Sequence, residues 1–381
     1  MKQILITFLF SLTLYSLSAQ DNLERISTLR SSRIDTSISE VNEVINLYEN
    51  YLNSNPDSIY NNPYWNQKEK SLYKDFDFSR ISMYQGGMTA NQLCQIFTPF
   101  IMSVESIGKK YQIKVMFSSP TIDQKYAGSK VWCIHKLNAV KEGKQWFLEN
   151  LIVELSEKWI NKKVGEIEYV YPPSHDFETR QGKLSKQFCK DIIKRFNPTY
   201  NTLFKYYVTN SIDDMGLLEN FDYYFVGITT GKARENMILT AKGNEYYPHE
   251  FIHQLLPANQ NRGYVIEEGL AVFLGTKKDE IEYENLLMKL ASDLKISPDK
   301  INFMSVVSQE VKFNGYQTAY PTGAVLCELV HNKTGDKGLC QLMAANTTDY
   351  KNITNAIMAI TNLTLEEIIK EWNQIIQKYN R

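Results

Sequence analysis

The chain of 381 residues lacks several features that point to common functional classes. Its 42 basic and 43 acidic residues nearly cancel, so no excess charge indicates binding to nucleic acid or to an anionic membrane surface. No internal repeat or low-complexity segment is present. Cysteine is scarce, and an odd number among apolar neighbours favours buried free thiols over a disulfide framework, with one bridge in the C-terminal half left open. The cysteines are Cys94, Cys133, Cys189, Cys327 and Cys340.

Long apolar runs are also missing, apart from one at the start of the chain. Lys2 gives this segment a positive start, residues 4–14 are mostly apolar, and Ala19 offers a small residue for cleavage. The pattern predicts a signal peptide over residues 1–19, and therefore a soluble product exported to the periplasm or the cell exterior. A run this short does not span a bilayer, so the mature chain is expected to have no membrane span. The alternative is an apolar first strand that is kept in the fold.

Histidine is scarce as well, with five in the chain, yet two of them lie close together in His249-Glu250-Phe251-Ile252-His253. Residues four apart on a helix lie about 40° from each other around the axis, so both imidazoles can reach one metal ion. Glu250 lies about 100° from His249, where it can touch a metal-bound water without being a ligand. The spacing predicts a Zn2+ site with Glu250 as its acid–base residue.

A tetrahedral zinc ion that keeps one open position needs a third protein ligand. Glu268 follows His253 with fourteen residues between them, in a segment whose apolar residues recur at helical spacing. Pro248 suits the first turn of a helix and Pro257 ends it, which places the two histidines on a short helix. We expect Glu268 to be the third ligand. The competing interpretation is a buried structural histidine on an amphipathic helix beside an ordinary solvated glutamate.

Two other zinc patterns can be tested on the same residues. A metzincin needs glycine and histidine three and six positions after the second histidine, where this chain has Leu256 and Asn259. The inverted order His-x-x-Glu-His is absent from the sequence. Both families are therefore excluded.

The patterns His249-Glu250-x-x-His253 and Glu268-Gly269-x-Ala271 resemble those of the gluzincin metallopeptidases, which include aminopeptidase N and its relatives. The resemblance continues at Tyr320-Pro321-Thr322-Gly323 and covers roughly residues 165–381. It implies that Glu268 is the third zinc ligand and that Tyr320 stabilises the transition state. Tyr316 lies before Tyr320 at an offset similar to that of the family.

Two departures from the aminopeptidase N pattern qualify this resemblance. The gap between His253 and Glu268 is shorter than is usual in that group, which suggests the broader peptidase-MA-like branch. The strand that gives aminopeptidases their exopeptidase specificity is only echoed, by Ala233-Arg234-Glu235-Asn236. The sequence therefore leaves endopeptidase and exopeptidase activity both open.

The rest of the chain predicts an α+β fold in two parts. Residues 20–162 are expected to form an N-terminal α+β domain on an antiparallel sheet, with a helix at 38–52 and a boundary between 159 and 173 where 161–165 breaks the pattern. Its expected strands are 111–117, 130–140 and 145–155, with a hairpin turn at 141–144.

Residues 163–381 are expected to form the gluzincin-type catalytic domain, with a sheet-bearing upper lobe and a helical lower lobe. Its expected strands are 202–208, 221–229 and 237–240, and its expected helices are 184–196, 211 onward, 284–294, 323–333, 337–345 and 365–379. In gluzincins an edge strand hydrogen-bonds the extended substrate. Residues 223–230 and 235–240 are the two candidates for that strand.

Together these features predict an exported zinc peptidase that acts on a peptide or protein substrate. Glu250 would take a proton from the attacking water and pass it to the leaving amine. Glu267 has two readings, a partner that orients a histidine or a solvated carboxylate, and His331 is a weaker alternative to Tyr320. His135 is expected to be structural. The second hypothesis is a non-catalytic, zinc-stabilised module that binds peptides or glycans.

Overall fold

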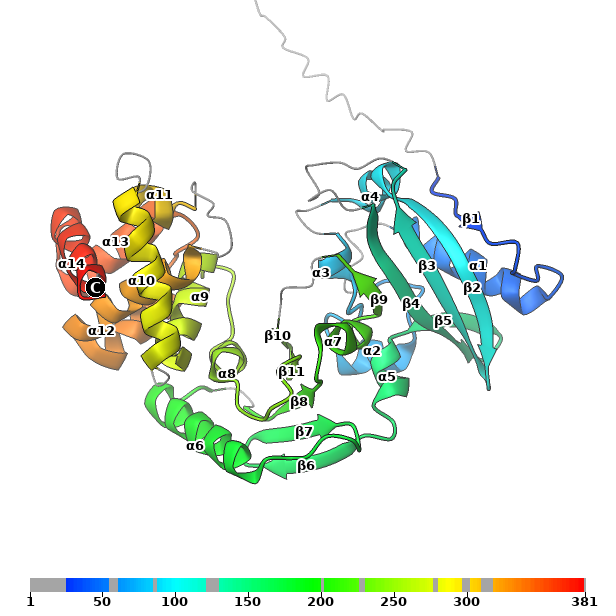
Figure 1. The fold of residues 1–381 in the computed structure, drawn as a ribbon, viewed down its shortest axis with the longest axis horizontal. Coiled ribbons are helices and arrows are strands. Elements are labelled where there is room, and N and C mark those ends of the chain that lie inside the picture. The colour runs from blue at the N-terminus through cyan, green and yellow to red at the C-terminus, as the bar shows by residue number, and fades with distance from the viewer. Residues whose placement is uncertain are drawn as a thin grey trace, which may run out of the picture.

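The computed structural model shows an α+β protein with two sheets and a group of C-terminal helices (Figure 1). The expected signal peptide over 1–19 and Tyr316 lie outside the residues that the structure describes. The described residues are 25–54, 61–84, 88–120, 130–199, 202–225, 230–276, 280–296, 302–309 and 318–379.

The N-terminal region, residues 25–155, supplies strands β1 to β5 of the first sheet and the helix α1 (Ser39–Leu52) that packs on it. The sheet is ordered β1-β2-β3-β4-β5, and β9 pairs with β4. All of its pairings are antiparallel except β1 with β2. Its strands are β1 (Leu29–Arg30), β2 (Thr98–Ile107), β3 (Lys110–Ser118), β4 (Val131–Glu142), β5 (Gln145–Glu149) and β9 (Phe221–Tyr224). Three short helices accompany them, α2 (Gln67–Leu72), α3 (Arg80–Met83) and α4 (Ala90–Ile96).

Alternating side chains explain how this sheet covers α1. Every second residue of β3 from Ile113 to Phe117 is fully buried, while the residues between them are partly exposed. The buried face meets the apolar side of α1, on which Val44, Ile45 and Tyr48 have no exposed surface. The N-terminal region therefore has a hydrophobic core of its own.

The second sheet is mixed and is ordered β10-β11-β8-β7-β6. Its strands are β6 (Ile160–Val164), β7 (Ile167–Tyr171), β8 (Phe204–Val208), β10 (Gly231–Arg234) and β11 (Met237–Thr240). Its two faces belong to different cores, because neighbouring side chains of a strand point to opposite faces. Tyr206 packs with the helices, whereas Tyr207 packs with Met215 and Leu218 of α7 (Ile212–Leu218).

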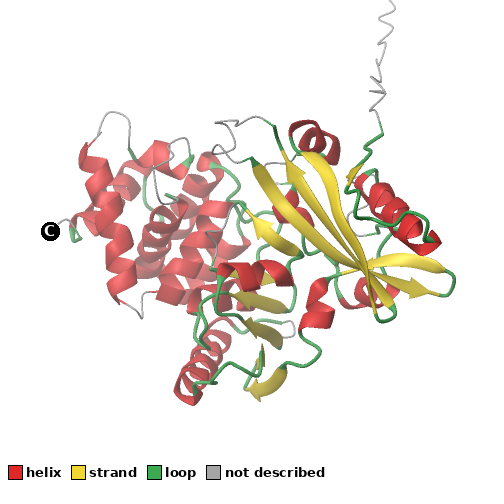
Figure 2. Cartoon of the chain, turned by 45° about the vertical axis from the view of Figure 1, so that its right-hand side comes forward, coloured by secondary structure: helices red, strands yellow, loops and turns green. Residues whose placement is uncertain are grey.

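The later helices, α8 to α14, gather on the side away from the N-terminal sheet, whereas α5 lies beside that sheet (Figure 2). A π-helical turn, Val272–Thr276, follows α9 directly, and α12 bends at Gly335, whose φ is 64°. The helices are α5 (Leu151–Leu155), α6 (Thr179–Phe196), α8 (Pro248–Leu255), α9 (Tyr264–Ala271), α10 (Glu280–Ile296), α11 (Phe303–Val307), α12 (Ala319–Ala344), α13 (Tyr350–Thr361) and α14 (Leu365–Gln377).

The two expected parts share structure across the predicted boundary. The segment 161–165, expected to break the pattern, lies in the hairpin of β6 and β7, with Gly165 at its turn at a φ of 66°. Strand β9, from beyond the boundary, completes the N-terminal sheet by pairing with β4. In addition, Phe78 and Ile152 join the small core on the outer face of the second sheet. The N-terminal region is thus packed directly against the sheet that precedes the helix of His249 and His253.

The α+β class is confirmed. Of the strand predicted at 221–229, residues 221–224 form β9 and 226–229 lie outside the described residues, and another predicted strand is wrong in part. Residues 145–149 form β5, whereas 151–155 form the helix α5. Asn150 is held by the Glu69 carboxylate, and the backbone N–H of Leu151 donates to the Asn220 side chain, so the chain leaves the sheet here. Strand β2 escaped prediction because only Pro99 and Ile101 are buried in it, which hides the alternation. In the described part of the chain no helix is both long and apolar enough to cross a bilayer.

Candidate metal centre

The metal helix α8 lies between the second sheet and the C-terminal helices (Figure 1). Pro248 occupies its first turn, as the sequence predicts, and the helix ends at Leu255. Phe251, Ile252 and Leu255 are buried on one side. The packing of these residues fixes the rotation of the helix and leaves His249 and His253 on the other side, partly exposed.

His249, His253 and Glu268 converge, and each offers one donor atom to a common point. His249 Nε2 lies 3.3 Å from His253 Nε2, and Glu268 Oε2 lies 3.3 Å and 3.5 Å from the same two atoms. Donors bound at about 2.05 Å to a tetrahedral ion are separated by about 3.3 Å, which matches these three distances. Among the described residues they form the one group of His, Cys, Asp and Glu side chains close enough to hold a metal ion.

One oxygen of this donor set, on Glu268, has no hydrogen-bond partner among the described residues. This oxygen, Oε2, is buried. A buried carboxylate oxygen without a partner is costly. A divalent cation placed among the three donors would satisfy it, so the residues present fit a metal ion.

Two glycines explain why Glu268 and Tyr320 meet at one place. Gly269 follows Glu268 on α9, and Gly323 follows Tyr320 by one helical turn on α12. A Cβ atom on Gly269 would lie 2.2 Å from the Gly323 backbone, and one on Gly323 would lie 1.9 Å from the Val265 carbonyl oxygen. The helices cross with their backbones in contact, which carries both functional side chains to the same site.

His253 is oriented by a chain of charged partners. Its Nδ1 lies 2.8 Å from Glu267 Oε1, and Arg262 donates to Glu267 Oε2, also at 2.8 Å. A carboxylate can only accept, so Nδ1 carries a proton, and Nε2 is the nitrogen that faces the common point and can bind a metal when the ring is neutral. Of the two predicted readings of Glu267, the structure shows the partner that orients a histidine.

The charges of the site favour a cation. Burial works to lower the pKa of His253, but Glu267 and Glu268 outweigh it and raise that pKa to about 10. Burial likewise works to raise the pKa of Glu268, but the two histidines outweigh it and lower that pKa to about 2. The carboxylates thus hold positive charge among these side chains. A metal ion can take the place of the protons, because imidazole binds metals as the neutral ring.

Glu250 lies beside the donor set without belonging to it. Its side chain is buried at 5% exposure, and burial is the main reason that its pKa is raised. The backbone of Ala233 in β10 hydrogen-bonds its carboxylate. A carboxylate whose pKa is raised towards neutrality is a stronger base than one in water, as proton transfer at the site would require.

Tyr320 lies at the N-terminal end of α12, directly against the donor set. Its ring stacks on His249 with centroids 5.6 Å apart and planes 12° apart. Burial, then the charge of Glu268, raises the pKa of Tyr320 far above its ordinary value, so its hydroxyl keeps its proton. The site therefore contains a neutral O–H donor, in the position that the sequence pattern suggests.

The two other histidines considered from the sequence lie elsewhere. His331 is eleven residues beyond Tyr320, which corresponds to about 16 Å along a helix, and it contacts Phe273 and Asp336. It does not line the hollow at the site. His135 is buried, with Nδ1 2.8 Å from the Tyr48 hydroxyl and Nε2 3.0 Å from the Ser79 hydroxyl. Its structural role is confirmed by these two hydrogen bonds.

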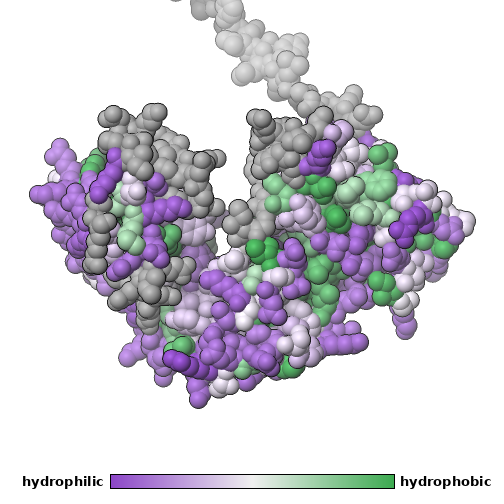
Figure 3. All heavy atoms as spheres, in the orientation of Figure 1, coloured by the Kyte–Doolittle hydropathy of each residue, from purple (hydrophilic) through white to green (hydrophobic). Residues whose placement is uncertain are grey.

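The donor set opens into a hollow of about 420 Å³ between β10, α8 and α9. Figure 3 shows the surface deeply hollowed between the helical side and the N-terminal side. The sequence offered residues 223–230 or 235–240 as the edge strand, and no described residue of either segment forms the edge strand of the second sheet; residues 226–229 lie outside the described residues. Tyr223 belongs to β9 in the other sheet, and β11 is paired on both sides. The edge of the second sheet is β10, and its residues line the hollow.

Several residues around the site escaped the sequence analysis. Strand β10 has only four residues, too few for a clear alternation, and Arg262 lies on the turn before α9. The alternation of small and basic residues from Gly231 to Arg234 was the available signal for β10. All five cysteines are free, as expected. Cys133, Cys189 and Cys327 are buried and Cys94 is partly buried, but Cys340 is exposed, so the expectation of a buried thiol is wrong there.

A comparison with models of known protein families finds no match for this chain, and a search of curated protein sequences finds none either. Function must therefore be inferred from the side chains of the site and their geometry.

Proposed function

We propose that this chain is an exported, zinc-dependent peptidase of the gluzincin type, with a sheet-bearing upper lobe and a helical lower lobe around the metal. The observation that carries the proposal is the spacing of three donor atoms, 3.3 to 3.5 Å apart, next to a buried glutamate that is not one of them. A purely structural zinc site does not need that glutamate and usually fills all four positions with protein ligands.

His249, His253 and Glu268 would hold the ion, and Glu267 would fix the ring of His253. Zinc bound in this way supplies a Lewis acid for the scissile carbonyl and lowers the pKa of a bound water to about 7. Two neutral imidazoles and one carboxylate leave the ion a net positive charge, which suits both tasks.

Glu250 is the proposed general base and general acid. It accepts the proton of the attacking water at a carboxylate oxygen and returns it to the nitrogen of the leaving amine. Its burial favours this work, because the raised pKa brings the carboxylate closer to the pH at which it must both accept and release a proton.

Tyr320 is the proposed donor to the oxygen that becomes negative in the transition state. Its ring is held by stacking on His249, so its hydroxyl needs little reorganisation during the reaction. A donor of this kind contributes about 3 kcal/mol in enzymes where it has been removed.

Strand β10 is the proposed binding edge for the substrate. Among the described residues it is paired with β11 on one side only, and its Ala233 backbone faces Glu250. An extended peptide that adds to this edge would be held through its backbone groups with its scissile bond near the metal donors. The substrate class is therefore a peptide or an unfolded segment of a protein.

The test is hydrolysis of a peptide library by the zinc-loaded chain and by Glu250→Gln, with bound zinc measured by elemental analysis. Glu250→Gln should bind zinc normally and lose hydrolysis by about 10²-fold or more. A matched control is Glu371→Gln, which alters a surface carboxylate paired with Lys333. Normal hydrolysis by Glu250→Gln would overturn the proposal. A zinc-loaded chain that cleaves no peptide would favour the non-catalytic binding module instead.

A further inference from the structure

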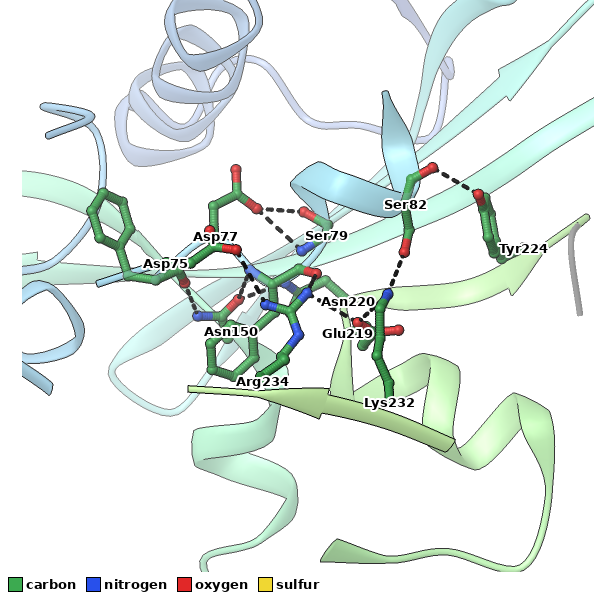
Figure 4. Close-up of polar contacts among 12 residues, drawn as sticks. Asp75, Asp77, Ser79, Ser82, Asn150, Glu219, Asn220, Tyr224, Lys232 and Arg234 are labelled. Carbon is green, nitrogen blue, oxygen red and sulfur yellow. Dashed lines mark hydrogen bonds and ion pairs between the residues drawn. The ribbon is translucent and has the colours of Figure 1, made fainter. Parts of the chain in front are cut away.

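The side chains of β10 point alternately towards the metal helix and towards the N-terminal region. A Cβ atom on Gly231 would lie 2.7 Å from Glu250 Oε1, and Ala233 hydrogen-bonds Glu250 through its backbone. The other two side chains, Lys232 and Arg234, turn to the opposite side and reach residues of the N-terminal region (Figure 4). Strand β10 therefore lies between helix α8 and the N-terminal region and contacts both.

Glu219, at the C-terminal end of α7, joins these two basic side chains. Its side chain is 7% exposed, and its carboxylate lies 2.8 Å from Lys232 Nζ and 3.0 Å from Arg234 Nη2. Burial works to raise the pKa of Glu219, but the two cations outweigh it and lower that pKa, so the carboxylate stays charged. The charge is compensated twice, as a buried carboxylate requires.

The same basic side chains continue into the N-terminal region. Arg234 donates to the carbonyl oxygen of Phe78, its guanidinium lies 4.8 Å from the Phe78 ring centre, and it is 3.7 Å from Asp75. Lys232 donates to the Ser82 hydroxyl at 2.8 Å. The backbone N–H of Lys74 donates to Glu235, the first residue after the strand.

A pair of buried asparagines ties this cluster to the core of the N-terminal region. Asn220, next to Glu219, donates to Asn150 at 2.7 Å, and Asn150 donates to the Phe76 carbonyl oxygen at 2.6 Å. Both side chains are fully buried. The segment 75–82 and the end of α7 are therefore one fixed unit.

We propose that the N-terminal region is a positioning part of the metal centre, and that Lys232 and Arg234, anchored on Glu219 and on residues 75–82, hold the edge strand β10 in register beside Glu250. The inference rests on the proposed function only in naming what the edge binds. A four-residue strand with one neighbour frays when its other side is not fixed. Anchoring it reduces the entropy that is lost when an extended peptide pairs with the edge.

The test compares Arg234→Met, Lys232→Met and the conservative Arg234→Lys with Arg195→Met as the matched control. Arg195 pairs with Asp336 on a partly exposed surface away from β10. Amide hydrogen exchange of the full chain reports directly on the strand. Arg234→Met should speed exchange in residues 231–241 by about tenfold or more, with β3 and α12 unchanged. Arg234→Lys should restore much of the protection, and Arg195→Met should change nothing in this segment.

Kinetics supply the second readout, because substrate length separates positioning from general damage. For a long peptide, Arg234→Met should raise KM by about tenfold with a smaller change in kcat, since pairing with the edge is weakened. A blocked dipeptide, too short to pair along β10, should be cleaved almost normally. Equal losses on both substrates, or exchange that is unchanged or faster throughout the chain, would overturn the positioning role.

Failure of the proposed function gives a different pattern. If the wild-type chain cleaves neither substrate, the peptidase proposal fails, while the exchange measurement still decides whether Arg234 and Lys232 anchor the strand. Lys232→Met, at a side chain that is 25% exposed, keeps the test available if Arg234→Met does not fold.

Discussion

His135 in the N-terminal region and His253 at the proposed metal centre are both largely buried, yet their surroundings shift their pKa values in opposite directions. Burial lowers the pKa of His135 to about 3. For His253 the carboxylates of Glu267 and Glu268 overcome burial and raise the pKa to about 10. The neighbours of each ring, more than its depth, decide which form it takes.

The comparison also separates a structural histidine from a ligand. Both nitrogens of His135 are hydrogen-bonded to hydroxyls, so neither is available to bind a metal ion. His253 uses Nδ1 on Glu267 and turns Nε2 towards a second histidine nitrogen and a buried carboxylate oxygen without a hydrogen bond. Three donor atoms gathered at one point form an arrangement that the proposed metal ion would satisfy.

The largest expected effect comes from removing the Glu268 carboxylate, which lies beside His253 at the proposed metal centre. Glu268→Ala should lose tight zinc binding and with it all hydrolysis, because two imidazoles alone hold zinc weakly. His135→Gln should keep a full complement of zinc, measured by elemental analysis after dialysis. If Glu267→Ala loses zinc while Glu268→Ala keeps it, the ligand assignment is wrong by one residue.

Removing the hydroxyl of Tyr320 should leave the metal in place and slow the reaction. We expect Tyr320→Phe to lower kcat by about 10²-fold, because a donor to the transition state is lost while the ring still stacks on His249. Steady-state kinetics and zinc content measure the two effects. Turnover equal to that of the wild type would assign Tyr320 to the core instead.

A smaller effect is expected from the partner of His253. Glu267→Gln keeps the size of the side chain but weakens its hold on Nδ1, so zinc affinity should fall by about 10- to 100-fold. Competition with a fluorescent chelator measures the affinity. The result that would count against this role is an unchanged affinity, since a solvated carboxylate would give that outcome.

The smallest effect concerns His135 and the stability of the fold. Its folded pKa of about 3 lies below the ordinary value of 6.5, so the unfolded chain takes up a proton first as the pH falls. The resulting stability is present above about pH 6.5 and is lost progressively below it, by on the order of 1 kcal/mol between pH 7.5 and 5.5. Urea unfolding of His135→Gln should show a correspondingly weaker pH dependence than the wild type. Identical pH dependence of the two proteins would contradict it.

Features that depend on residues close together in the chain were predicted from the sequence, whereas features that depend on distant residues were not. The helix of His249 and His253, the hairpin turn at 141–144 and the capping box of Thr364 with Glu367 all depend on neighbours within four residues, and each is present. The sequence left two candidates open for the edge strand, because the edge of a sheet depends on which strands pair. Residues 237–240 form β11, which pairs with β8, 32 residues earlier in the chain. Helix α5 replaced part of a strand because Asn150 bonds Glu69, which is distant in sequence.

The sequence alone determined the local geometry of the site, because the pitch of a helix fixes where residues four apart lie. The spacing of four residues places His249 and His253 on the same face of the helix before any tertiary contact forms. Only the tertiary structure decided that Glu268 meets them, through the close crossing at Gly269 and Gly323, and that β10 lies against Glu250. These contacts join segments far apart in the chain, and their formation depends on how whole surfaces pack, which no short spacing encodes.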